Sequence, residues 1–101
     1  MTVREAIMLA AASALTEVDG VVGPSRDYGT PLGGGRIPGV VCMAAAGGGY
    51  DVTVYVTARP VPLKPLGERV MSQIVGAVGA AGFDRDLADV RVVVLDIATP
   101  A

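Results

Sequence analysis

The segment Tyr50-Asp-Val-Thr-Val-Tyr-Val-Thr-Ala-Arg59 decides the fold, because its apolar and polar side chains alternate with the two-residue period of a β-strand. One face carries Val52, Val54, Val56 and Ala58, and the other carries Asp51, Thr53, Tyr55, Thr57 and Arg59. This pattern predicts a strand that buries one face, and by itself it predicts that the other face is exposed to solvent.

The residues before this strand predict its first neighbour. Residues 39–45 form a run of small apolar residues, and Gly47, Gly48 and Gly49 separate that run from Tyr50. Two apolar runs joined by a glycine turn are typical of an antiparallel hairpin.

Two helices flank the hairpin in sequence. Thr2 and Glu5 have the spacing of a capping box, and Gly20 is a suitable stop, so we expect a first helix over residues 3–18. Pro65 suits the first turn of a second helix that ends at Gly82. The expected buried stripes are Ile7, Ala11, Ala14, Leu15 and Val18 on the first helix, and Leu66, Val70, Ile74, Ala77, Val78 and Ala81 on the second.

A final strand over residues 90–97 completes the order α-β-β-α-β. We therefore expect a two-layer α+β fold, with a three-stranded mixed sheet covered on one face by two helices. Glycines and prolines predict a loop over residues 27–38, and residues 98–101 are expected to be a disordered tail. The whole chain, residues 1–101, is expected to be one domain.

The final strand is apolar on both faces, which a strand buried on one side does not require. One interpretation is that simple alternation does not set the register of this strand, or that it is a central strand whose second face the loop over residues 27–38 covers. The other is that this face binds a protein partner or a second copy of the chain. The second interpretation predicts an interaction surface made of Tyr55, Val93, Leu95 and Ile97.

Composition excludes several classes of function. The net charge is −2, which argues against a nucleic-acid binder because such proteins need a basic face. The chain has no His and one Cys, so the usual transition-metal sites are out of reach, and no cofactor is expected. No stretch is long and apolar enough to insert directly into a membrane, and the leader around Arg4 and Glu5 lacks the charge of a signal peptide. We therefore expect a cytoplasmic protein.

No catalytic residues are identified. Nucleophilic catalysis needs a nucleophile beside a base, and Cys42 lies in a predicted strand with no neighbouring Lys to lower its pKa. Gly76, Gly79 and Gly82 recur every third residue. They indicate either close approach of the first helix or, as the alternative function, a KH-like Gly-x-x-Gly loop that binds RNA or a nucleotide.

Five segments together resemble the alkaline-shock (envelope stress response) family in its actinobacterial form. They are Ala11–Gly23, Arg36–Val41, Asp51–Thr57, Pro65–Val70 and Val90–Ile97. The resemblance implies a non-enzymatic bacterial protein of cell-envelope homeostasis that acts as an interaction or scaffold module. It implies a protein partner, in some relatives a membrane anchor protein that holds the domain at the inner face of the membrane, and assembly into homo-oligomers.

Overall fold

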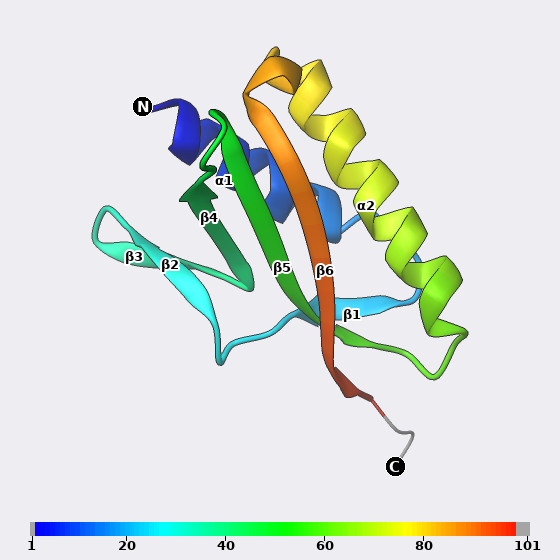
Figure 1. Cartoon of the computed structure of the whole chain (residues 1–101). Helices are drawn as coiled ribbons and strands as arrows, with labels where there is room; N and C mark the ends of the chain where they lie inside the picture. Colours follow the sequence, from blue (N-terminus) through cyan, green and yellow to red (C-terminus); the bar gives the residue numbers. More distant parts are fainter. Residues whose placement is uncertain (1, 99–101) are drawn as a thin grey trace.

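The chain folds into two layers, with two helices against one face of a β-sheet (Figure 1). This computed structural model describes residues 2–98. The elements are α1 (Val3–Leu15), β1 (Val21–Pro24), β2 (Gly29–Leu32), β3 (Gly35–Pro38), β4 (Val40–Ala44), β5 (Tyr50–Ala58), α2 (Leu63–Ala80), the short 3₁₀ helix η1 (Asp84–Asp86) and β6 (Leu87–Ile97). The predicted two-layer α+β fold is confirmed.

Strand β5 is the centre of the sheet. Strands β4 and β1 both pair antiparallel with one edge of β5, β4 along its first half and β1 along its last residues. Strand β6 pairs parallel with the opposite edge, so the sheet is mixed as predicted. Strand β1 adds a fourth strand to the three that the sequence predicts.

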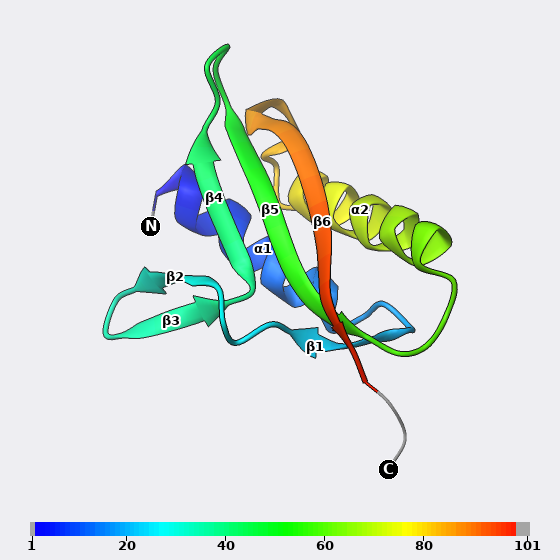
Figure 2. The same ribbon diagram turned by 60° about the horizontal axis from the view of Figure 1, so that its bottom comes forward.

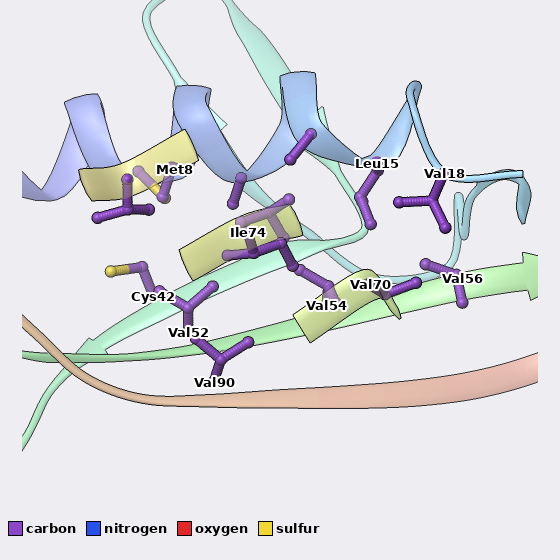
Figure 3. Close-up of a cluster of buried hydrophobic side chains, with 14 of the residues drawn as sticks. Met8, Leu15, Val18, Cys42, Val52, Val54, Val56, Val70, Ile74 and Val90 are labelled. Atoms are coloured by element: carbon purple, nitrogen blue, oxygen red, sulfur yellow. The ribbon is translucent and has the colours of Figure 1, made fainter. Parts of the chain in front are cut away.

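The core lies between β5 and the helices (Figure 3). The apolar face of β5 is almost completely buried, and the two predicted helix stripes pack on it, with two exceptions on the second helix: Ala77 is only half-buried, and Ala81 follows α2 and is exposed. Complete burial of one Val, Leu, Ile or Met side chain contributes roughly 1.5–3 kcal/mol to stability. The largest of the fully buried side chains are those of Ile7, Met8, Leu15, Val40, Cys42, Val52, Val54, Val56, Leu66, Val70, Ile74 and Val78.

Local signals place the helix ends. The Thr2 hydroxyl accepts a hydrogen bond from the amide of Glu5, and the Glu5 carboxylate accepts one from the amide of Thr2, so the capping box is confirmed. Helix α1 ends at Leu15 rather than at residue 18. The amide of Thr16 donates to the carbonyl of Ser13, three residues earlier, at 3.2 Å, which is the spacing of a 3₁₀ turn. The Thr16 hydroxyl donates to the same carbonyl at 2.8 Å. Gly82 follows α2 with φ +90°, in agreement with its predicted role as a stop.

The predicted loop over residues 27–38 is wrong, because β2 and β3 form a two-stranded hairpin there (Figure 2). Gly33, with φ +59°, makes its tight turn. Thr30 and Ile37 are opposite each other and both are buried, so they attach the hairpin to the core. Residues 99–101 of the predicted tail lie outside the described residues, and Ala98 donates a backbone hydrogen bond to Ala58 at 2.8 Å.

Gly39 connects the hairpin to the sheet. Its amide donates to the carbonyl of Tyr28 at 2.7 Å, and its carbonyl accepts from the amide of Tyr55 at 2.7 Å. Its φ is +73°, and a Cβ atom at this position would lie 2.6 Å from the Cβ of Pro24 and 2.7 Å from the carbonyl oxygen of Tyr55. Only glycine can adopt this positive φ and also leave the space that a Cβ atom would occupy.

Substituting Gly39→Ala is therefore expected to destabilise the fold by roughly 2–4 kcal/mol, the sum of backbone strain and overpacking. Gly33→Ala is the matched control, because Gly33 also has positive φ but nothing lies within 4 Å of the added Cβ. The free energies of unfolding come from urea titrations followed by circular dichroism. Equal losses in the two variants would contradict the close contact at Gly39.

Candidate interaction surface

The face of the sheet away from the helices is mixed in character. Residues that are in register across neighbouring strands share a face, so β4, β5 and β6 contribute rows of side chains to it. They are Val41, Met43, Asp51, Thr53, Tyr55, Thr57, Asp89, Arg91, Val93 and Asp96. We call this set the open face, and it is neither wholly polar nor a continuous apolar patch.

Tyr28, in the segment predicted to be a loop, covers part of the open face. The ring of Tyr28 stacks on the ring of Tyr55, with centroids 4.3 Å apart and an interplanar angle of 13°. Such stacking adds about 0.5–1.5 kcal/mol beyond the buried area. At Tyr55, therefore, the segment before β2 occupies the position that a partner would otherwise take. Tyr28 is not among the predicted interaction residues, and its signal in the sequence is that of an aromatic residue among glycines and prolines.

The structure brings together three of the four predicted interaction residues. Tyr55 and Val93 are in register on the open face, and both are half-buried. Leu95 is exposed and lines a hollow that Thr57 on the same face also lines. Ile97 is different, because it is in register with Ala58, whose side chain faces the helices.

A β-bulge explains the separation of Ile97 from the other three. Val94 is opposite Val56, but Asp96 rather than Leu95 is opposite Thr57, so β6 contains one extra residue. A one-residue insertion moves every later side chain to the other face. The expectation that Val93, Leu95 and Ile97 share one face is therefore wrong for Ile97.

A hollow of about 720 Å³ lies at the end of the open face, between β6 and the segment that follows β1. Leu95 and Asp96 line one side, and Arg26 and Asp27 line another. Ser25 also contributes, but it is buried and its hydroxyl accepts a hydrogen bond from the amide of Asp27 at 3.3 Å. That bond belongs to a local turn, so it gives Ser25 a structural role.

The outer edge of β6 is the second notable surface. Among the described residues β6 pairs with β5 alone. Strand β1 passes behind the last part of β6, and α2 rather than a strand lies beside its first half (Figure 1, Figure 2). A groove of about 250 Å³ lies at its first half, lined mainly by Met71 and Val75 from α2 and by Leu87 and Val90 from β6. Met71 and Val75 are 42% and 47% exposed, which is unusual for apolar side chains beside a free strand edge.

Cys42 faces the core and is completely buried. Burial raises the pKa of its thiol, the charge of Arg4 partly lowers it, and Asp51 raises it. The Arg4 side chain donates to the backbone carbonyl of Cys42 at 2.9 Å and so holds α1 against β4. A buried thiol with a raised pKa is a poor nucleophile.

The glycine repeat on α2 does not form a binding loop. The helix runs without a break from Leu63 to Ala80, so the KH-like loop expected at Gly76 and Gly79 does not exist. Close approach of α1 does not explain Gly76 either, because a Cβ atom there would meet nothing within 4 Å.

Within residues 2–98, no three His, Cys, Asp or Glu side chains lie close enough to hold one metal ion. No helix of the described chain is long and apolar enough to cross a bilayer.

Sequence comparison identifies no relative, since no protein-family model matches the chain and no curated protein matches it. Structure comparison finds similar folds among solved structures of the MamM CTD. One single-residue variant is 16% identical with a TM-score of 0.53, over 94% of this chain and 95% of that one. A second is 12% identical with a TM-score of 0.55, over 93% and 96%. A nickel form of a third variant is 15% identical with a TM-score of 0.53, over 94% and 99%. At these identities the likeness shows a shared fold.

Proposed function

We propose that this chain is a non-enzymatic interaction module that associates with further copies of itself to act as a scaffold. One observation carries the proposal: β6 is a long edge strand whose outer edge has no partner among residues 2–98, and exposed apolar side chains line it. Proteins usually protect such an edge with charges, prolines or a covering element, because it pairs readily with another strand.

The surface around β6 includes part of the interaction site predicted from the sequence. Leu95 and Ile97 are exposed at the end of this strand, and Val93 lies between them and the groove. Tyr55 is largely occupied by its stacking with Tyr28. The four-residue surface stays a prediction, and the groove beside Met71 and Val75 is the stronger candidate for self-association.

The cellular role that we propose is envelope stress response. The five segments that resemble the alkaline-shock family support it. Under this proposal the protein is cytoplasmic, and a membrane anchor protein holds the assembled scaffold at the inner face of the membrane.

The wild-type chain is expected to self-associate in sedimentation velocity measurements over a range of protein concentrations. The double variant Met71→Asp with Val75→Asp is expected to raise the dissociation constant roughly tenfold or more, because two apolar side chains would no longer be buried. The control is Val3→Asp with Leu9→Asp, two comparably exposed apolar residues on α1. A wild-type chain that stays monomeric at millimolar concentration would overturn the proposal.

If the protein is not an enzyme, as we propose, the thiol of Cys42 is expected to be unreactive in the folded state. Folded protein is expected not to react with a chromogenic disulfide reagent at pH 8, and to release one equivalent of chromophore once guanidinium unfolds it. Because the folded-state pKa lies above that of the unfolded chain, the favourable contribution of the neutral thiol is complete below the unfolded-state pKa and is lost as pH rises through the folded-state pKa. Met43→Cys, at an exposed neighbouring position, is the positive control. Rapid reaction of Cys42 in the native state would revive a catalytic role.

The proposed role in envelope stress response predicts where the chain is found in the cell. In gently lysed bacterial cells, a tagged chain is expected to sediment with the membrane fraction and to leave it at high salt, since a protein partner rather than an inserted helix would hold it. Fractionation followed by immunoblotting measures this distribution. A chain found only in the supernatant, both before and after alkaline shock, would contradict membrane association.

A further inference from the structure

The backbone of β6 shows which of its groups are free. Tyr55 directs both its amide and its carbonyl away from β6, to Gly39 and Ser25, whereas the carbonyl of Ala58 accepts from Ala98, which follows β6. The even-numbered residues of β5 therefore bond to β6. In a parallel ladder each of them bonds to the residues on either side of its register partner. Val52 is in register with Val90, so Asp89 and Arg91 bond to β5.

The backbone groups of Val90 therefore point to the outside, and those of Val92 do the same because Val54 is in register with Val92. The side chains alternate in the same way. Asp89 and Arg91 lie on the open face, while Val90 lies against the core. A strand that approaches from outside thus meets free donors and acceptors at alternate residues, flanked by one negative and one positive side chain.

These charges select one arrangement of two identical strands. If a second β6 pairs antiparallel about a two-fold axis at Val90, Val90 lies opposite its own copy in a hydrogen-bonded pair. Asp89 of each copy then lies opposite Arg91 of the other, in a non-hydrogen-bonded pair where side chains are closest. An axis at Asp89 or at Arg91 would instead place like charges opposite each other, which is unfavourable.

The helix layer fits the same arrangement. The groove formed by Met71, Val75 and Leu87 runs beside the edge around Val90. An axis at Val90 brings the grooves of the two copies together beneath the joined strands, so the exposed Met71 and Val75 of one copy can pack on those of the other. A single two-fold axis at Val90 therefore provides hydrogen-bond partners for the free backbone groups, pairs Asp89 with Arg91, and buries Met71 and Val75.

We propose that the chain forms a two-fold symmetric dimer through antiparallel β6–β6 pairing centred on Val90, with reciprocal Asp89–Arg91 pairs and a continuous sheet across both copies. This inference rests on the proposed self-association and specifies its partner, a second copy, and its register.

Charge reversal tests the register. Asp89→Arg places two arginines opposite each other at both positions, and Arg91→Asp places two aspartates there. Each single variant is expected to weaken the dimer about tenfold or more at low salt, since an attraction becomes a repulsion at two places. The double variant, Asp89→Arg with Arg91→Asp, restores both opposite-charge pairs and is expected to dimerise like the wild type.

An equimolar mixture of the two single variants is the sharpest arm. One chain then supplies only arginines and the other only aspartates, so a heterodimer with two opposite-charge pairs is expected where neither variant dimerises alone. Sedimentation velocity measures association, and circular dichroism checks that each variant is folded. Amide hydrogen exchange should show protection of Val90 and Val92 that increases with protein concentration.

The outcomes separate the two proposals. Single variants that dimerise as well as the wild type, or a mixture that shows no recovery, would overturn the β6 register while leaving self-association intact. A wild-type chain that is monomeric throughout would overturn both.

Discussion

Burial of one face of β5 is the constraint on which the remaining structure depends. Val52, Val54, Val56 and Ala58 are removed from water by α1 and α2, and this burial fixes the pleat, the register and the face that the helices occupy. A shift of one residue would turn the polar side chains into the core. Both helices are therefore confined to one layer, and β1, β4 and β6 are each placed by pairing with β5, while within the described chain β2 and β3 pair only with each other.

The two edges of β5 have different consequences for function. One edge is shared by β4 and β1, and the backbone of Tyr55 binds both Gly39 and Ser25 there, so that side of the sheet is closed by the β2–β3 hairpin and its flanking segments. The other edge receives only β6, which leaves β6 as the boundary of the sheet. The same topology that completes the core therefore leaves the long outer edge of β6 available for assembly. Within residues 2–98 the shorter β4 also pairs with β5 alone, but its Val40 and Cys42 carbonyls accept hydrogen bonds from the side chains of Thr30 and Arg4.

Features that depend on interactions between residues close in sequence were predicted correctly, and features that depend on distant contacts were not. The capping box at Thr2 and the glycine stop at Gly82 are local, and both were predicted correctly. The hairpin at residues 27–38 was missed because its glycines and prolines have low strand propensity, and its stability depends on distant contacts such as the bond from the Thr30 hydroxyl to the carbonyl of Val40. The position of Ile97 was wrong because alternation in a sequence does not reveal a bulge.

The sequence by itself determined the two-layer fold, since alternation in β5 and the helical stripes are periodic signals that a chain carries without reference to its neighbours. It also determined the residue types available for chemistry, with no His and a single Cys. Only the tertiary structure decided that Tyr28 covers Tyr55 and that the long outer edge of β6, beside Met71 and Val75, is left without a neighbouring strand in the described part of the chain. The physical reason is that stacking, strand order and edge exposure arise from contacts between residues far apart along the chain.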